Sequence, residues 1–418
     1  MLTDLPMRLL HTVRQYAADQ DAASRDHQRI YVLFTIALFK LLNFFGGNWD
    51  IQWHVAIGRD NLFIPPHLMV LVAFGGGITL AWFWIVHETF AGRANEQPGE
   101  TMRVGIFKAP PAFFGVFLGY AFALLSGLFD EGWHEIFGID STLWSPPHIC
   151  IMASTMFVDL NLMIGISTTA RRLGMKFEPR SPLFWGLALT GAYTFEAVNF
   201  QMSQAFIEAY RVNGSGMTGL LYPMLVGALF PFPLLLTIKI ARQFRVALMI
   251  FAVAISLQLV GIGIAAAGFA ILQPVSVITD FIRLNPESSI SKASAFINNL
   301  GFSGWVGFLQ TWSLLLSALP LGLVALLDFL PWARHRPLVA APVYSASLVA
   351  ISYIWFKQMP VMRDYAITWP DVFLGGALSA CMGIILGRLG LRIARLVLAE
   401  DSEPVDTERG SHSVAPVL

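Results

Sequence analysis

Residues 246–272 read VALMIFAVAISLQLVGIGIAAAGFAIL, a stretch without a single charged side chain. A helix needs about 20 mostly apolar residues to cross the hydrocarbon core of a bilayer, so this stretch predicts a membrane-spanning helix. Comparable runs lie on both sides of it. The predicted spans are residues 30–49, 66–88, 110–129, 147–170, 183–203, 219–240, 246–272, 303–330, 338–356 and 370–390. We therefore expect an all-α integral membrane protein, a polytopic bundle of about ten helices.

The overall composition agrees with this fold class. Of the 418 residues, 56% are hydrophobic and 13% are charged, whereas soluble domains average about 25% charged residues. The 27 Lys and Arg residues balance the 27 Asp and Glu residues, so no net charge favours nucleic acid as a partner. Cys150 and Cys381 both fall in apolar runs, which argues against a disulfide framework and against a cysteine zinc site.

The distribution of basic residues predicts the orientation. Most Lys and Arg residues lie in the two terminal segments and in the loops after even-numbered spans, and basic loops stay in the cytoplasm. We expect both termini in the cytoplasm and the loops 50–65 and 130–146 outside. In a Gram-negative bacterium, this means the inner membrane with the two loops in the periplasm. The first 29 residues lack the pattern of a cleavable signal peptide.

Four regions follow from these features. They are a cytoplasmic N-terminal segment (1–29), a four-helix repeat (30–180), six further spans (181–398) and a polar tail that we expect to be disordered (399–418). The outer loop 274–302 contains apolar residues that predict a short amphipathic helix on the membrane surface. These residues are Val277, Phe281, Ile282 and Leu284.

The two outward loops repeat one motif. The first reads WDIQWHVAIGRDNLFIPPH from Trp49 to His67, and the second reads DEGWHEIFGIDSTLWSPPH from Asp130 to His148. An Asp and a His four residues apart share one face of a helix, and Pro-Pro before the second His suits the first turn of the next helix. Each copy thus predicts a carboxylate and two imidazoles meeting at one corner. The two sets are Asp50, His54 and His67, and Asp130, His134 and His148.

Two His and one carboxylate can hold a transition metal while leaving coordination positions open. A single copy would not require a metal, because an Asp at a helix end is often a solvated cap and a His beside Trp often belongs to the aromatic belt. Four of the nine His residues fall in the two matched loops, which favours metal binding. We expect Asp60 and Asp140 to accept hydrogen bonds from ligand His residues of their own loops.

The repeat resembles the copper-binding membrane subunit of the copper membrane monooxygenases, the particulate enzymes that oxidise methane or ammonia. The similarity covers about residues 30–170. The matching positions are Asp50, Trp53-His54, Arg59-Asp60, Pro65 and His67 in the first loop, and Asp130, His134, Pro146 and His148 in the second. In the methane enzymes Asn stands at the position of Asp130. The resemblance implies neighbouring copper sites within the membrane. For the two His and Asp sets we rank copper first, iron next and zinc third.

Three ionisable residues fall inside predicted spans, where such groups are costly and usually paired or functional. Lys40 and Asp159 are expected about 15 Å below the two loops, at matching depth. We therefore predict an ion pair, with either a structural or a proton-relay role. Glu196 lies about two turns from the outer end of its span and is either an extra ligand or base or a hydrogen-bonding partner of a neighbouring helix. His87 and Glu88, at the cytoplasmic end, are assigned no chemistry.

These observations lead to one functional hypothesis and two competitors. We predict a membrane oxidoreductase of monooxygenase type, acting on a small apolar substrate, with companion subunits or a homo-oligomer as possible partners besides the lipid bilayer. The first competitor is a copper-handling or copper-transporting protein. The second is a structural subunit in which fully ligated metal only stabilises the fold.

Overall fold

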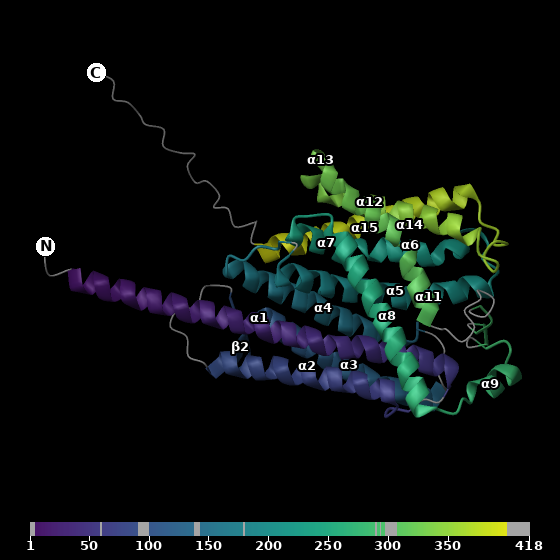
Figure 1. The fold of residues 1–418 in the computed structure, drawn as a ribbon, viewed down its shortest axis with the longest axis horizontal. Helices are drawn as coiled ribbons and strands as arrows, with labels where there is room; N and C mark the ends of the chain where they lie inside the picture. The colour runs from purple at the N-terminus through teal and green to yellow at the C-terminus, as the bar shows by residue number, and fades with distance from the viewer. Residues whose placement is uncertain are drawn as a thin grey trace, which may run out of the picture.

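The computed structural model describes residues 5–58, 61–90, 100–137, 143–178, 180–288, 291–292, 294–296 and 307–398. The fold is an all-α, polytopic helical bundle, as the sequence predicts (Figure 1). Within the described residues, nine helical segments are long and apolar enough to span a membrane. They are Ala23–His54, Pro65–Phe90, Pro111–Phe137, Pro146–Arg172, Gly216–Ala241, Val246–Leu272, Thr311–Phe329, Pro337–Phe356 and Trp369–Leu398.

The predicted fifth span differs from the others. Helix α5 (Pro182–Arg211) has the length of a span but is not among the nine apolar segments of the described chain. Its sequence carries buried polar residues, including Thr194, Glu196, Asn199 and Gln204. Because α5 packs against α4, α6, α7, α8 and α11, these groups face protein rather than lipid, where polar groups are tolerated.

The first four spans form the predicted four-helix unit. Helices α1 (Leu5–Ala56), α2 (Pro65–Phe90), α3 (Pro111–Phe137) and α4 (Pro146–Arg172) pack in sequence order, and α1 also packs on α4. A hairpin of β1 (Met102–Val104) and β2 (Phe107–Ala109) precedes α3. Gly76 and Gly77 let the rings of Phe39 and Tyr120 approach the α2 backbone, which is the close packing that a Gly run permits.

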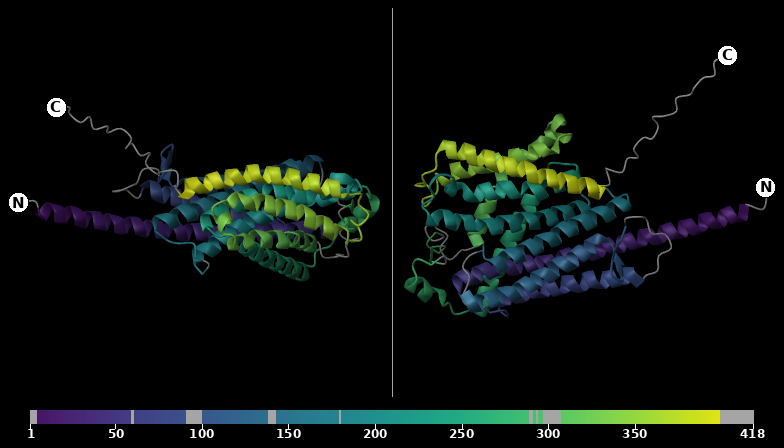
Figure 2. Two further views of the ribbon diagram at one scale, coloured as in Figure 1. Left: turned by 90° about the horizontal axis from the view of Figure 1, so that it is seen from above. Right: turned by 180° about the vertical axis from the view of Figure 1, so that it is seen from behind.

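Helix α1 continues well beyond the predicted first span. Residues from Leu5 onward form one helix with the membrane segment, ending at Ala56. Both views in Figure 2 show its N-terminal part projecting past the other helices. The segment predicted as a separate cytoplasmic region is thus, from Leu5, an extension of the helix that carries Asp50 and His54.

Two of the later spans are interrupted. Pro231 begins α7 (Pro231–Ala241) directly after α6 (Leu221–Leu229), which follows a 3-10 turn at Gly216–Leu220. The predicted span 303–330 contains α11 (Gly307–Leu315), α12 (Ala318–Leu326) and a 3-10 turn at Leu327–Phe329. Proline lacks the N–H that a continuous helix needs, which explains the first break.

The remaining helices complete the bundle on the far side of α5. Helix α8 (Val246–Leu272) contacts both α1 and α5, and it crosses them obliquely in Figure 1. Helix α15 (Trp369–Leu398) packs on α6, α7 and α14 (Ala340–Phe356). Between α12 and α14 lie α13 (Pro331–Arg334) and a 3-10 turn at Pro337–Val339.

The predicted amphipathic segment is helix α9 (Ile278–Leu284). Phe281 and Leu284 are exposed, but Ile278 is buried against the loop that follows α1. The N–H of Val277 donates to the carbonyl of Ile57 at 2.8 Å. Helix α9 therefore covers part of the first outward corner. The tail predicted to be disordered, 399–418, lies outside the described residues.

Candidate metal centre

The first corner brings Asp50, His54 and His67 together. Asp50 and His54 are one turn apart near the end of α1, and His67 lies in the first turn of α2, after Pro65 and Pro66. Asp50 Oδ1 is 3.5 Å from His54 Nε2 and 3.1 Å from His67 Nε2. One ligand atom from each of the three lies within 4.8 Å of the others, and no other described group of His, Cys, Asp or Glu meets this criterion.

A backbone carbonyl orients one imidazole of this corner. His67 Nδ1 is 3.0 Å from the carbonyl oxygen of Asn61, so Nδ1 donates and Nε2 is directed toward Asp50. The sequence predicted this supporting role for Asp60, which lies outside the described residues. A backbone acceptor leaves no mark on the sequence pattern, so Asn61 could not be predicted.

Aromatic rings cover the same corner. Trp53 stacks on Phe269 of α8 at a centroid distance of 5.9 Å, and Trp49 meets Phe269 edge-on. Both tryptophans are buried. In the first copy, the Trp of the Trp-His pair therefore joins the repeat to the second half of the chain.

The second corner has the same residues in a wider arrangement. Asp130 and His134 come from α3, and His148 comes from the first turn of α4. Asp130 Oδ1 is 3.6 Å from His134 Nε2, and Asp130 Oδ2 is 3.6 Å from His148 Nε2. The Ser145 hydroxyl lies 2.9 Å from His148 Nδ1 and fixes that ring. Asp140, predicted for this role, is outside the described residues.

Ser145 was missed although the sequence contains a signal for it. It precedes Pro146 and lies three residues before His148, where Ile64 stands in the first copy. A Ser just before a helix commonly accepts or donates a local hydrogen bond. At this position the first copy of the repeat has Ile64 and the second has Ser145. This difference between the copies indicates a polar neighbour for His148.

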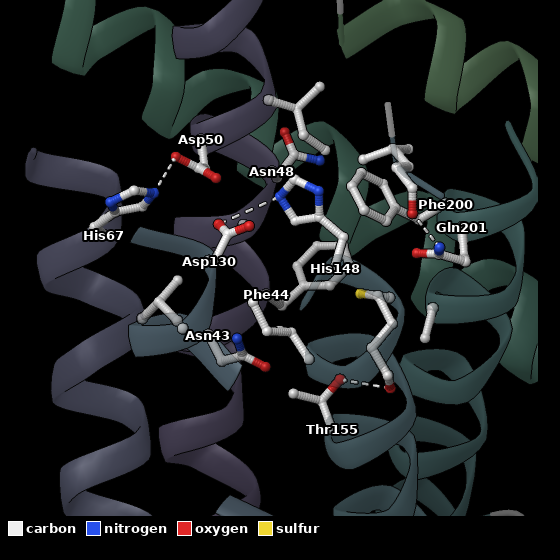
Figure 3. A pocket seen from close by; sticks show the side chains of 18 of the residues that line it. Asn43, Phe44, Asn48, Asp50, His67, Asp130, His148, Thr155, Phe200 and Gln201 are labelled. Atoms are coloured by element: carbon white, nitrogen blue, oxygen red, sulfur yellow. Dashed lines mark hydrogen bonds and ion pairs between the residues drawn. The ribbon is translucent and has the colours of Figure 1, made fainter. Parts of the chain in front are cut away.

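Both corners open into one cavity of about 290 Å³. Figure 3 shows the Asp50–His67 and Asp130–His148 pairs toward the same end of it, beyond Asn43 and Thr155. His54 also lines the cavity. His134 is not one of the lining residues, but its Nε2 lies 3.6 Å from Asp130, which is. Below His67 and Asp130, the lining residues of α2 and α3 are apolar: Val70, Leu71, Phe74, Leu124 and Leu128.

The predicted ion pair lies deeper, on helices α1 and α4. Lys40 Nζ is 3.2 Å from Asp159 Oδ1 and donates to the carbonyl of Thr155 at 3.0 Å. Both side chains are buried, and Lys40 contributes to the cavity wall. The predicted ion pair is therefore present and joins α1 to α4, with each charge opposite a partner of the other sign.

Glu196 reaches the same cavity from α5. It is buried and belongs to the lining, although no described contact joins it to any of the six corner residues. The cavity wall thus contains three acidic residues, Asp50, Asp130 and Glu196, while its Lys40 is already paired with Asp159. This surplus of carboxylates favours a bound cation.

At the opposite end of the bundle, Glu88 has a partner that the sequence did not reveal. Arg29 donates to Glu88 at 2.6 Å, to Asp26 at 2.6 Å and to Glu100 at 2.5 Å. Arg172 lies 3.2 Å from Glu100. Asp26 and Arg29 are one helical turn apart, but Glu88, Glu100 and Arg172 lie far from them in sequence, so spacing alone could not predict the network. His87 stacks on Trp84, in keeping with its lack of an assigned chemical role.

The first corner is close to the geometry of a bound metal ion. Two ligand atoms each about 2.0–2.2 Å from a tetrahedral ion lie roughly 3.3–3.6 Å apart, and the carboxylate–imidazole distances of the first corner are 3.1 and 3.5 Å. In the second corner both carboxylate–imidazole distances are 3.6 Å but run to different oxygens of Asp130, and its three residues do not meet the 4.8 Å criterion. Nitrogen and carboxylate oxygen donors suit copper, iron and zinc.

Comparison with known proteins gives no further guide to function. The chain matches no protein-family model, no curated protein and no solved structure. Function is therefore inferred from the geometry of the cavity and of its two corners.

Proposed function

We propose that this chain is a metal-dependent membrane oxidoreductase of monooxygenase type, with copper as the first candidate metal. The observation that carries the proposal is that two carboxylate–imidazole corners open into one largely apolar cavity inside a membrane bundle. Asp50, His54 and His67 would hold one ion, and Asp130, His134 and His148 a second. An ion with open coordination positions would supply the binding and activation of dioxygen.

The protein's own residues would contribute binding and orientation. Asn61 and Ser145 fix the ring positions of His67 and His148, so the donors are arranged before an ion arrives. The apolar wall from α2 and α3 would accept a small apolar substrate that dissolves in the bilayer. In this proposal the chain lies in the inner membrane of a bacterium, with the corners facing the periplasm.

The main alternative is a copper carrier or transporter. A path for a cation needs ligands that continue through the bilayer, and below His148 the wall offers Met152 and Thr155. The next group is the Lys40 ammonium, held by Asp159. An ammonium group cannot ligate a cation, and its pairing occupies the Asp159 carboxylate, so the ligands do not continue inward. This favours catalysis over transport.

Metal analysis of the purified protein tests the proposal first. We expect bound copper in the wild type and its loss when His54→Ala and His134→Ala are combined. His87→Ala is the matched control, because His87 lies at the other end of the bundle and should leave the copper content unchanged. Equal copper content in all three proteins would reject both corners as sites.

Spectroscopy of the copper-loaded protein then separates the alternatives. After reduction and exposure to dioxygen, a catalytic centre should change its copper oxidation state, which electron paramagnetic resonance detects. A redox-silent ion in the wild type would favour the carrier or the structural subunit. Turnover of a short alkane with a chemical reductant, absent from the double variant, would identify the reaction.

A further inference from the structure

The hairpin of β1 and β2 lies at the end of the bundle opposite the two corners. Figure 1 shows β2 beside α2, at the end from which α1 projects. The N–H of Lys108 donates to the Thr89 hydroxyl at 2.9 Å, which fixes β2 to the last turn of α2. The Phe107 ring contacts Trp82 of α2, with a centroid distance of 4.7 Å. The hairpin therefore has a defined position on the bundle, as a binding surface requires.

This position is at the border of the bilayer. Helix α2 has 26 residues, which at 1.5 Å per residue make about 39 Å, more than the roughly 30 Å of a hydrocarbon core. The last turn of α2, with Thr89, therefore reaches the headgroup layer. Trp82, two turns earlier, is 39% exposed, as is typical of the aromatic belt at a membrane interface.

The strand pairing gives the hairpin two chemically different faces. Arg103 pairs with Lys108, and Val104 pairs with Phe107. Because successive side chains of a strand point to opposite faces, Arg103 and Lys108 share one face, and Val104 and Phe107 share the other. The hairpin is thus amphipathic, with a basic face and an apolar face.

The apolar side chains near the tip are open to the surroundings. Met102 and Val104 are exposed, and Ile106, in the turn, is 75% exposed. They add to exposed apolar side chains at the same end of α2, Phe83 and Phe90. Exposed apolar groups beside basic ones at a membrane border favour the boundary between headgroups and acyl chains.

The basic face favours an anionic partner. Arg103 and Lys108 stand directly opposite each other, and like charges in this arrangement destabilise a strand pair. An anionic group bound between the two side chains removes this cost. A lipid phosphate is the anion present at this depth of the bilayer, so the charge of the hairpin complements its surroundings.

We propose that the hairpin is a binding site for an anionic phospholipid. The headgroup phosphate lies between Arg103 and Lys108, and the side chains of Val104 and Ile106 lie among the upper acyl chains. In the orientation proposed above, the hairpin faces the cytoplasmic leaflet, where anionic lipids attract basic residues. The site lies at the opposite end of the bundle from the two corners and does not depend on a metal ion.

The depth of the hairpin tip is tested with a nitroxide label at Ile106→Cys, in a full chain with Cys150→Ser and Cys381→Ser. Electron paramagnetic resonance in phosphatidylcholine nanodiscs compares relaxation by oxygen, which concentrates among acyl chains, with relaxation by a nickel chelate, which stays in water. Adding phosphatidylglycerol should lower the nickel accessibility of the label. The matched control is a label at Glu178→Cys, an exposed position at the same end of the bundle, which should stay in water.

The basic residues are tested in the same labelled chain. Arg103→Gln should raise the phosphatidylglycerol content needed for this movement about fivefold, the effect of one basic residue near an anionic surface. Adding Lys108→Gln should abolish the movement. The control, Arg171→Gln with Lys176→Gln, removes the same charge from exposed residues at the same end and should leave the movement unchanged. Equal losses in the two double variants would mean a general surface attraction and overturn the site.

Two further outcomes would overturn the proposal. A label at position 106 that the nickel chelate reaches as easily as the label at 178, in both lipid mixtures, places the hairpin in water and favours a protein as its partner. Soluble glycerophosphate, added to phosphatidylcholine nanodiscs, should not move the label, because it brings no acyl chains. Movement with glycerophosphate assigns the two bases to a free phosphate ester instead of a lipid.

Discussion

The two outward corners share one motif but not one environment. The first is covered by Phe269 of α8 and by α9, and its ligand atoms all lie within 4.8 Å of one another. In the second, Trp133 contacts Phe129 and Phe137 of its own helix, and both ion-pair distances are 3.6 Å. The loop of the second corner is instead joined to α5, where the indole N–H of Trp144 donates to the carbonyl of Gln201 at 2.8 Å. The comparison shows that the two copies of one motif pack against different helices of the second half of the chain, with the tighter ligand set beside α8 and α9.

The largest effect is expected on copper binding when one His ligand is removed from one corner at a time. We expect His67→Ala to remove the tighter class of copper site and His148→Ala to remove the weaker class, because each deletes a ligand from one corner only. A copper titration followed by calorimetry measures both classes. If either variant alone abolished all copper binding, the corners would form a single inseparable centre.

The next effect concerns the ion pair that joins the helices of the two corners. Lys40→Met should lower the free energy of unfolding by about 3–5 kcal/mol, because Asp159 is left buried without its counter-charge. Combining Lys40→Met with Asp159→Leu should recover part of this loss. Thermal unfolding of the single and double variants in detergent measures the coupling.

The two outcomes of that cycle are clearly distinct. A double variant as unstable as the sum of the single variants would contradict the contact between Lys40 and Asp159. Partial recovery supports a structural role, since a structural pair can be replaced by apolar residues that pack well.

A smaller effect is expected for Ser145→Ala. Loss of the hydroxyl that fixes His148 should weaken copper binding about 10-fold to 100-fold, and only at the second corner. The first corner should keep its affinity, because His67 is fixed by the backbone carbonyl of Asn61. The same titration checks this difference, and an equal loss at both corners would contradict it.

The smallest effect concerns the contact between α9 and the loop that follows α1, beside the first corner. Gly58 has a φ of 76°, and a Cβ added there would lie 2.9 Å from Ile278 Cβ. Gly58→Ala should destabilise the protein by about 1–2 kcal/mol through left-handed backbone strain. We expect faster amide exchange in α9 and a modestly weaker first copper site, with the second site as the internal control. Unchanged exchange in α9 would mean that this contact does not hold the cover in place.

Much of the fold could be predicted because apolar run length and helix length are local properties. The spans and the two corners follow from hydropathy and from i, i+4 spacing, and the Lys40–Asp159 pair follows from depth, which the constant helical rise provides. The helix break at Pro231 could also have been predicted from the proline itself, but a search for long apolar runs does not detect a break within a run.

The features that escaped prediction depend on which helices become neighbours. Helix α5 is central because it packs against α4, α6, α7, α8 and α11, and the pairing of Arg29 with Glu88 and Glu100 joins segments far apart in sequence. The cover of the first corner by Phe269 and α9 has the same origin. For the candidate site, the sequence predicted the six corner residues, whereas the shared cavity and the hydrogen bonds of Asn61 and Ser145 required coordinates.

The buried Lys40–Asp159 pair also constrains how the chain is made. If spans enter the membrane in order of synthesis, Lys40 arrives with α1 while Asp159 is still three helices away. An isolated lysine at the centre of a helix raises the insertion free energy by about 2.5–3.5 kcal/mol. The arrival of α4 removes this penalty, so biogenesis of the first four helices is coupled, and a nascent chain truncated before α4 should be retained poorly in the bilayer.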